Sequence, residues 1–586
     1  MYANSFKKLN PDELPPWALG YHEWSKDQYY QNIKAQLEKA GQEGRGAIND
    51  IRFYLPQWAS DPRLLWRVWR WLAINGGQAP GLNERRYSDL YDLEIWSLLV
   101  AIQAGIKAGT YQPGPVKRVS IPKDRYDTGC GERSIALLNI EDRVVQRATG
   151  EILQPLFAPL FGKTIIGFRP GHDRMDALAL AQKKMLEESR FVLITEDIKN
   201  AFDNVPRKRL MDIVAKYIPS PEIVELIRRF VCIDNRKKGI PQGAPLSPLL
   251  LNLYLYHSVV RKWKPESGLA ATKIICYADD ILLICRTQKE SHAAWNKLSD
   301  LLKKAGLPVK HGYSRAMVDL RREKSARWLG YSVQYRNKNL ITKIDKKSWS
   351  SLKESLERAH EEPDSPLRAI SIITGWLDQL GPCFRHEDRR YVTKKIRRIA
   401  SDCGFDEIPD SHTLKFIWLL AYARWWQRVV RLRGALPQRI EDRAHEDEFY
   451  APSDGLCVDA AWNDKKKLME YRGVWLDDGT EAFRVDPIST GSNNIGEFLA
   501  IVRGLQLLKR KGIDCPVYSD SQTALSWLKN LSVNSRSARG QKLSPRVYQR
   551  IMRAVLWLTR QADLNPVLKW NTDDWDEIPA DYGRKS

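Results

Sequence analysis

Two adjacent aspartates lie between two apolar segments near the middle of the chain. Residues 274–284 predict two short strands joined by a tight turn that contains Asp279 and Asp280. Neighbouring carboxylates between buried strands repel each other and destabilise the fold unless a cation neutralises them. Hard divalent cations with oxygen ligands are the natural counterions. The pattern therefore indicates a metal site, although an isolated pair of aspartates at a turn is more often a purely structural feature.

A second apolar segment that ends in acid lies upstream. Residues 192–198 predict a strand with Asp197 near its end. Asp197 and Asp279 together could hold two metal ions about 3.5–4 Å apart, the arrangement that serves in-line phosphoryl transfer. Between the two segments, residues 239–248 are rich in Gly and Pro and precede a helical run. A loop of this kind lets the backbone approach a substrate closely.

Four dispersed carboxylates form a second set within the last 136 residues. Two of them end predicted strands, one lies at the start of a predicted helix and one lies near the C-terminus: Asp459, Asp520, Glu497 and Asp581. An acid at the end of a strand is usually a cap or a solvated charge. Glu497 follows Asn494 by three residues, so a capping box would explain both residues without any chemistry.

The elements that must position these acids fall into five predicted parts. Apolar periodicity predicts a multidomain α+β fold in which helical and mixed regions alternate. The parts are a helical N-terminal extension over 1–110, a mixed region over 111–340, helices rich in Arg and Trp over 341–435, a linker over 436–450 and an α/β unit over 451–586.

The basic charge is concentrated in the first 444 residues. The 586 residues carry 93 Lys and Arg against 71 Asp and Glu, a net charge of +22. Residues 445–586 contain twenty of each sign, so residues 1–444 carry the whole excess. Such a basic region predicts a polyanionic partner. No apolar run approaches the roughly 18–20 residues that a membrane helix needs. Charge alone does not separate nucleic acid from an anionic membrane; of the two we expect nucleic acid and no membrane partner.

The cysteines and the N-terminus indicate the cellular compartment. The eight cysteines are scattered without a CxxC pair. This spacing argues against a zinc site or a disulfide framework, and it favours reduced thiols in the cytoplasm. Residues 1–16 contain charged side chains and no apolar stretch. We therefore expect no secretory signal.

Three segments resemble the motifs A, B and C of reverse transcriptases, in the family's order and spacing. They are DIKNAFD at 197–203, PQGAPLSP at 241–248 and YADD at 277–280. Further segments resemble the bacterial branch related to group II introns: NGGQAPG at 75–81, IPK at 121–123, EDRVVQ at 141–146, GFRPG at 167–171, WLGY at 328–331 and GWL at 375–377. The resemblance covers roughly residues 60–435 and implies a right-hand polymerase fold with fingers, palm and helical thumb.

The resemblance implies roles for the acids of the predicted palm. Asp197, Asp279 and Asp280 match the family's catalytic aspartates. The first two would bind both Mg²⁺ ions of a two-metal site, and Asp280 would adjust the site. Lys310 and Lys324 compete for the position of the motif D lysine, and we favour Lys310.

Nucleotide contacts are implied in the same way. Lys123 and Arg133 match finger residues that meet the incoming triphosphate through charge-assisted contacts. Phe202 matches the position that screens out a 2′-hydroxyl. Gln242 and Gly243 would line the nucleotide and the template.

The order of the C-terminal acids resembles ribonuclease H of type 1. The segments NNIGEFLAIVRGL, VYSDS and EIPADYGRK are similar to its helix, third-acid and last-acid motifs. That family cuts the RNA of RNA–DNA hybrids with two Mg²⁺ ions, so the resemblance implies that Asp459, Glu497, Asp520 and Asp581 bind them. The chain departs from the family in two places. The first acid, Asp459, is followed by Ala-Ala-Trp where the family usually has Gly-Ser, and no histidine follows His445, so the mobile histidine of many bacterial members is absent. These departures affect the expected rate more than the chemistry.

The sequence thus predicts an RNA-dependent DNA polymerase with hydrolysis of hybrid RNA by its C-terminal unit. The expected partners are an RNA template, which could be a dedicated non-coding RNA, a DNA primer and product, and dNTPs; the oligomeric state is open. The alternative is an RNA-binding scaffold of a ribonucleoprotein in which catalysis is secondary. Antiphage defence, a retron-like element and a domesticated intron protein are all open as settings. We favour the first by analogy with its fused layout without an endonuclease motif.

Overall fold

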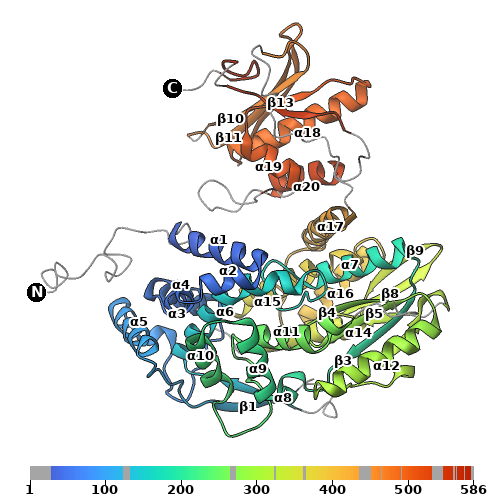
Figure 1. Cartoon of the computed structure of the whole chain (residues 1–586). Coiled ribbons are helices and arrows are strands. Elements are labelled where there is room, and N and C mark those ends of the chain that lie inside the picture. The colour runs from blue at the N-terminus through green and yellow to red at the C-terminus, as the bar shows by residue number, and fades with distance from the viewer. Residues whose placement is uncertain are drawn as a thin grey trace, which may run out of the picture. The chain divides into compact units, whose positions relative to one another are not determined.

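The protein forms two compact units in a computed structural model, Met1–Lys347 and Ser348–Ser586 (Figure 1). The predicted helices at 341–435 and the predicted unit at 451–586 therefore belong mainly to one compact unit, and the predicted linker at 436–450 lies outside the described residues. The structure describes residues 28–122, 132–263, 272–322, 325–360, 364–433, 451–463, 465–489, 491–530, 533, 545–558, 561, 564–572 and 575–582.

The first unit begins with helices, as the periodicity predicts. Asp61 caps α4, because its side chain accepts a hydrogen bond from the Arg63 amide and Pro62 opens the helix. The tryptophans Trp66 and Trp69 of this helix are buried, whereas Trp71 lies on its exposed side. The helices are α1 (Gln28–Glu43), α2 (Arg45–Asp50), α3 (Tyr54–Ala59), α4 (Pro62–Asn75) and α5 (Asp92–Lys107), and α1, α3 and α4 pack on α6 (Ile140–Phe161).

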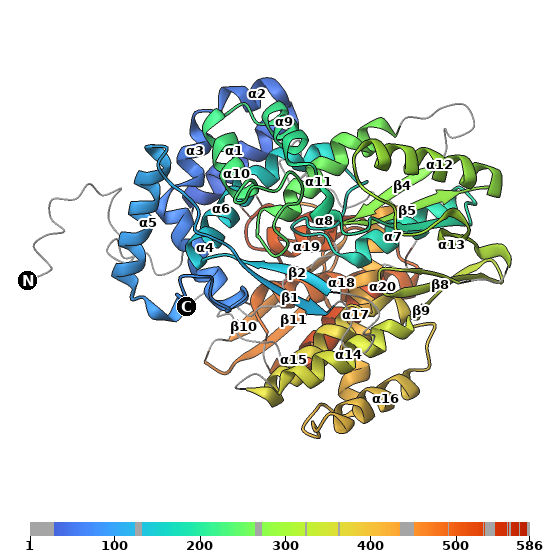
Figure 2. The ribbon, with the colours of Figure 1, turned by 90° about the horizontal axis from the view of Figure 1, so that it is seen from below.

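Two sheets follow in the first unit. The strands β1 (Lys117–Pro122) and β2 (Glu132–Leu137) pair antiparallel, and a four-stranded sheet has the order β4-β5-β3-β6 (Figure 2). Its strands are β3 (Val192–Asp197), β4 (Lys273–Tyr277), β5 (Asp280–Cys285) and β6 (Met317–Asp319). The helices α7 (Arg174–Glu187) and α12 (Gln288–Lys304) pack against it. The remaining helices are α8 (Ala201–Asn204), α9 (Arg207–Tyr217), α10 (Pro221–Val231), α11 (Ser247–Ser258) and α13 (Tyr313–Ala316).

A small sheet, β7-β8-β9, ends the first unit, and helices open the second. The strands are β7 (Ala326–Trp328), β8 (Tyr331–Arg336) and β9 (Asn339–Ile344). The helices are α14 (Lys346–Ala359), α15 (Ser365–Asp378), α16 (Arg389–Asp402) and α17 (Ser411–Arg433). Trp418 anchors α17, because its ring is fully buried and its Nε1 donates to the Leu380 carbonyl at 2.7 Å.

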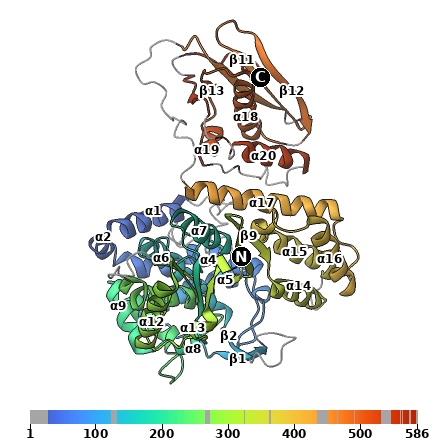
Figure 3. The same cartoon turned by 90° about the vertical axis from the view of Figure 1, so that its right-hand side faces the viewer.

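The C-terminal part of the second unit is a five-stranded sheet of order β12-β11-β10-β13-β14. Its first three strands are antiparallel, and β13 and β14 run parallel to β10. Helix α18 packs on β10 and β11 through its apolar side, as its periodicity predicts (Figure 3). The elements are β10 (Leu456–Asn463), β11 (Leu468–Trp475), β12 (Glu481–Ser489), α18 (Asn493–Lys511), β13 (Val517–Ser519), α19 (Gln522–Asn530), α20 (Pro545–Leu558) and β14 (Val567–Lys569).

Among the described helices, none combines the length and the apolar character that crossing a membrane requires.

Candidate active sites

The palm aspartates meet because two antiparallel strands end at the same place. In the pairing of β3 with β5, Asp197 lies directly opposite Asp280. Asp279 occupies the turn between β4 and β5, and its carbonyl accepts a hydrogen bond from the Ile198 amide at 3.2 Å. Directly opposed residues of an antiparallel pair have Cα atoms about 4.5–5.5 Å apart. The structure therefore brings together the three aspartates that the sequence pattern joined.

The turn that carries Asp279 packs closely against the backbone of Gly167. Ala278 has a left-handed φ of 56°, which a non-glycine residue adopts only where its surroundings impose it. A Cβ atom on Gly167 would lie 2.3 Å from the Ala278 nitrogen, so only glycine fits at this contact. Asn252 of α11 fixes Gly167 by donating to its carbonyl at 2.8 Å. The GFRPG segment and the helix after the PQG loop thus position the acidic turn.

The electrostatics of this turn are those of crowded, buried carboxylates. Burial, together with the charge of Asp197, raises the pKa of Asp279, and the same two causes raise the pKa of Asp280 to about 7. The Lys310 ammonium forms an ion pair with the Asp197 carboxylate. Burial would lower the Lys310 pKa, but the hydrogen bond to Asp197 raises it. Lys310, our favoured candidate for the motif D lysine, thus lies beside Asp197, and its rival Lys324 lies outside the described residues.

Sequence reasoning missed Glu196, the residue that orders this corner. Glu196 is only 1% exposed, and its Oε1 accepts from the backbone amides of Asp197, Lys310 and His311 at 3.1, 3.2 and 2.8 Å. Trp295 Nε1 donates to its other oxygen at 3.3 Å. The one sequence signal was an acid inside an apolar strand beside Asp197. Glu196 holds the chain around 310 against β3 and is a positioning residue.

The fingers hairpin approaches the palm through β2. Burial raises the pKa of Asp279, and the charge of Arg133 opposes that rise, so this predicted triphosphate contact lies near the aspartates. The Gln242 carbonyl accepts from the Ala136 amide at 2.7 Å. Gly243 has a φ of 97°, and a Cβ there would lie 3.1 Å from the Ile135 side chain. The PQG loop therefore lies against β2, beside Arg133.

Two further predicted nucleotide contacts have different outcomes. The Phe202 ring lies edge-on to Phe168 of the GFRPG segment, with ring centroids 6.2 Å apart. Its carbonyl accepts from the Ile240 amide at 2.9 Å, so it is tied to the PQG loop. Lys123 lies outside the described residues, and its role stays a prediction.

Three of the four C-terminal acids converge on one point. Asp459, Glu497 and Asp520 each offer a carboxylate oxygen, and these atoms all lie within 4.8 Å of one another. The topology explains this meeting, because β10 and β13 are parallel and pair Cys457 with Tyr518, so both strands deliver their acids at the same edge. Among the described residues, the palm aspartates are not grouped as closely as this.

The capping-box explanation of Glu497 is wrong. Helix α18 is capped by Ser492, whose hydroxyl accepts from the Ile495 amide at 3.4 Å. Glu497 lies beyond the capping positions, and Asn493 donates to its Oε1 at 2.7 Å. Its Oε2 is buried and has no hydrogen-bond partner in the described part of the chain. Burial and the charges of Asp520 and Asp459 raise its pKa to about 8.

These features fit a site for a divalent cation. Burial raises the pKa of Asp459 to about 7, and the charges of Asp520 and Asp581 act in the same direction. A cation would offset this repulsion and satisfy the open oxygen of Glu497. Asp581 is not part of the close group. Arg472 holds its segment by donating from Nε to the Ala580 carbonyl at 2.9 Å.

Comparison with known proteins finds a likeness in the first unit. Residues 121–333 match the family model of reverse transcriptase (RNA-dependent DNA polymerase). The group II intron-encoded protein LtrA of Lactococcus lactis subsp. cremoris is 26% identical over 231 residues, which are 38% of this chain and 37% of LtrA. Protein YkfC of Escherichia coli (strain K12) is 27% identical over 235 residues, 36% of this chain and 60% of YkfC.

A third relative is an uncharacterized 91 kDa protein in the cob intron of Schizosaccharomyces pombe, 29% identical over 159 residues. These matches support the predicted resemblance to intron-like reverse transcriptases. The alignment spans little more than a third of LtrA and 19% of the yeast protein. The matched residues lie within the first unit. The support for a site at the C-terminal acids is therefore their geometry in the structure.

Proposed function

We propose that the protein synthesises DNA on an RNA template and that its C-terminal unit hydrolyses the RNA of the resulting hybrid. The observation that carries the polymerase assignment is the register of β3 and β5, which sets Asp197 opposite Asp280 beside the turn at Asp279 within a reverse transcriptase domain. The three-acid group at Asp459, Glu497 and Asp520 supports the hydrolytic assignment.

The palm residues would divide the work of nucleotide addition. Asp197, Asp279 and Asp280 would hold Mg²⁺, which supplies polarisation of the attacking hydroxyl and of the phosphate oxygens. The Lys310 ammonium, whose raised pKa keeps it protonated, places a positive charge and a proton beside Asp197. Such a charge stabilises an anionic leaving group. Arg133 on β2 would contact the triphosphate.

The C-terminal acids would serve hydrolysis in the same manner. Asp459, Glu497 and Asp520 would hold Mg²⁺, and Asp581 would add charge at their edge. The absence of a histidine after His445 leaves proton transfer to these carboxylates and to water. A cytoplasmic location is part of this proposal, because the cysteines are scattered without a CxxC pair.

Primer extension tests the polymerase assignment. We expect full-length DNA from a DNA primer annealed to an RNA template, with dNTPs and Mg²⁺, and loss of that product in Asp279→Asn with RNA binding retained, because the change removes a metal ligand and no phosphate contact. Normal extension by Asp279→Asn would contradict the palm assignment. RNA binding without any extension by the wild type would favour the scaffold role.

Sequencing the RNA and DNA that co-purify with the protein would identify the template and primer. It would also test the proposed setting in antiphage defence, because a dedicated non-coding RNA and host transcripts would give different reads.

A further inference from the structure

The C-terminal unit is neutral as a whole, but its helices are strongly basic. Residues 445–586 carry equal numbers of basic and acidic residues. Within them, the helices α18, α19 and α20 carry eight Lys and Arg against one acid. That acid is Glu497 of the three-acid group. The helical side of this unit therefore has a positive excess that the acidic site does not balance.

Part of this excess surrounds a cavity of about 430 Å³ that lies between α18, α20 and the strands β11 and β12. Arg503 comes from α18, and Arg550 and Arg553 come from consecutive turns of α20. The walls between them are largely apolar, with Val485, Leu499 and Val502 among the lining residues. We call this cavity the arginine pocket.

The arginine pocket has no acid of its own. Within the described part of the chain, none of its three guanidinium groups forms an ion pair with a carboxylate, and each of these side chains is exposed. Burial raises the pKa of Tyr471, and the charges of Arg550 and Arg503 oppose the rise, so both guanidinium groups lie near the Tyr471 hydroxyl. Like charges held around one cavity repel each other, and an anion bound there removes the repulsion.

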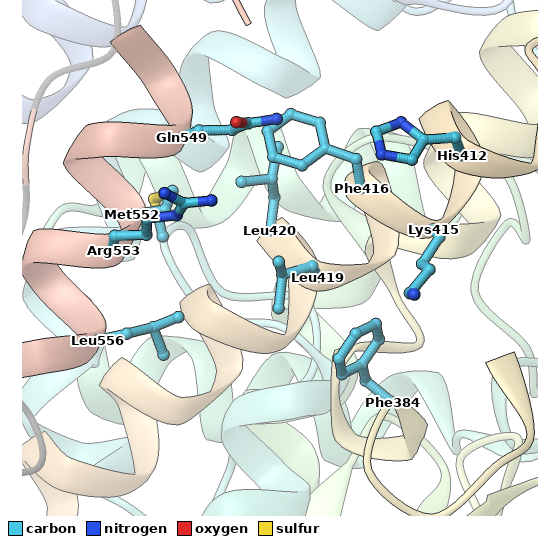
Figure 4. Close-up of a pocket in the computed structure, with 10 residues that line it drawn as sticks. All are labelled: Phe384, His412, Lys415, Phe416, Leu419, Leu420, Gln549, Met552, Arg553 and Leu556. Atoms are coloured by element: carbon cyan, nitrogen blue, oxygen red, sulfur yellow. The ribbon is translucent and has the colours of Figure 1, made fainter. Parts of the chain in front are cut away.

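A second cavity, of about 290 Å³, lies on the other side of α20, against α17. Figure 4 shows Gln549, Arg553 and other side chains from α20 facing Phe416, Lys415 and others from α17. Most of the lining is apolar, with the aromatic rings of Phe416 and Phe384, and the polar groups are few. Arg553 lines both cavities, so this one side chain of α20 borders each of them.

This combination is the chemistry that single-stranded nucleic acid requires. Basic side chains follow the phosphates, and an aromatic, apolar recess takes an unpaired base. A duplex would bring phosphates to the arginines but would offer no free base to the recess. The surface therefore fits a single strand better than a duplex.

The arginine pocket and the three-acid group are made of different residues. Tyr471, beside the arginine pocket, pairs with Ala460, and both belong to the core under α18. Asp459 is the next residue along β10, so its side chain points to the opposite face of the sheet. Glu497 reaches Asp459 from the start of α18, and none of the residues that line the arginine pocket belongs to the three-acid group.

We propose that α20 carries a single-strand binding site, with phosphates on Arg503, Arg550 and Arg553 and a base in the recess beside Phe416. This site requires neither polymerase nor nuclease activity, so its test is a binding measurement on the full chain in EDTA. The probes are oligonucleotides that contain 4-thiouridine or 4-thiothymidine, as single-stranded RNA, single-stranded DNA and duplex. After irradiation, the cross-linked peptides are mapped by mass spectrometry.

We expect a single-strand cross-link to the peptide of residues 545–558. It should fall at least tenfold in the variant Arg503→Gln/Arg550→Gln/Arg553→Gln. The matched control, Lys509→Gln/Arg510→Gln/Lys511→Gln, removes the same charge from the end of α18 and should keep the cross-link. Phe416→Ala should weaken it about tenfold, since stacking one base contributes that much. Primer extension by all variants checks that the first unit is intact.

Three results would overturn the proposal. They are no cross-link of the wild type to this peptide, equal loss in the arginine variant and its lysine-rich control, and equal cross-linking by single strand and duplex. A stronger signal from the RNA or the DNA probe identifies the strand that the site prefers. Hybrid cleavage, measured separately, reports on the acid site alone.

Discussion

The exchange Glu497→Gln should remove hydrolysis of hybrid RNA while stabilising the metal-free C-terminal unit. Glutamine keeps the length of the side chain and an oxygen for the Asn493 amide group, which donates at 2.7 Å. It removes one negative charge from the group at Asp459 and Asp520. Because the carboxylates position the metal, we expect cleavage to fall by two or more orders of magnitude.

The stability effect follows from the pKa of Glu497, which burial raises from 4.5 to about 8. An acid with a raised pKa binds its proton more tightly in the folded state, so the penalty is absent below about pH 4.5 and grows as pH rises towards 8. At 1.36 kcal/mol per unit of pKa, the penalty is roughly 3 kcal/mol at pH 7 and below about 1 kcal/mol at pH 5. In EDTA at pH 7, Glu497→Gln should therefore raise the Tm by about 5–10 °C.

Two assays together test the predicted stability gain and the predicted loss of cleavage in Glu497→Gln. Scanning calorimetry in EDTA at pH 7 and pH 5 measures the gain, and adding Mg²⁺ should stabilise the wild type more than the variant because only the wild type retains all the ligands. A labelled RNA–DNA hybrid measures cleavage. The control is Asp514→Asn, an exposed acid of the same unit. Undiminished cutting together with an unchanged or lower Tm in EDTA would refute the reasoning.

Three further changes probe the polymerase part and the second unit. Burial and neighbouring aspartates raise the pKa of Asp280 to about 7. In an Asp459→Asn/Glu497→Gln background, the affinity of the palm for Mn²⁺ should therefore fall about tenfold per pH unit below pH 7. Titration calorimetry measures this affinity, and a pH-independent value would contradict the prediction. Gly167→Ala places a Cβ 2.3 Å from the Ala278 nitrogen and should cut primer extension at least tenfold, whereas Gly46→Ala, which meets nothing within 4 Å, should not. Trp418→Ala empties a fully buried site and should cost about 3–5 kcal/mol in thermal unfolding of the second unit, and a change under 1 kcal/mol would show that the site collapses freely.

The meeting of Asp197 with Asp279 and Asp280 could be predicted because it needs only two antiparallel strands with acids at their ends. The choice of Lys310 over Lys324 could not be derived from the residues, because it depends on how a distant loop runs beside β3: the Lys310 amide donates to the Asp197 carbonyl at 2.9 Å. A tertiary contact between a loop and a distant strand leaves no pattern in the sequence around the loop.

The start of α18 shows a different limit. Ser492, Asn493 and Asn494 can all cap a helix, and a shift of the start by two residues decides whether Glu497 is a cap or a ligand. Helix ends are set by competition among such residues and by what the first turn packs against. The acid types and their order, by contrast, can be read from the sequence whatever the local boundary, because they do not depend on where the helix begins.

The surroundings of Glu196 predict which positions tolerate random mutation. Its two oxygens face four donors, the amides of Asp197, Lys310 and His311 and the Trp295 indole. Glutamine would turn one of those oxygens into a donor that faces another donor, and aspartate would fall short by one methylene group. Position 196 should therefore be depleted of every substitution in a library selected for DNA synthesis, as strongly as positions 197, 279 and 280, although Glu196 is not one of the proposed metal ligands.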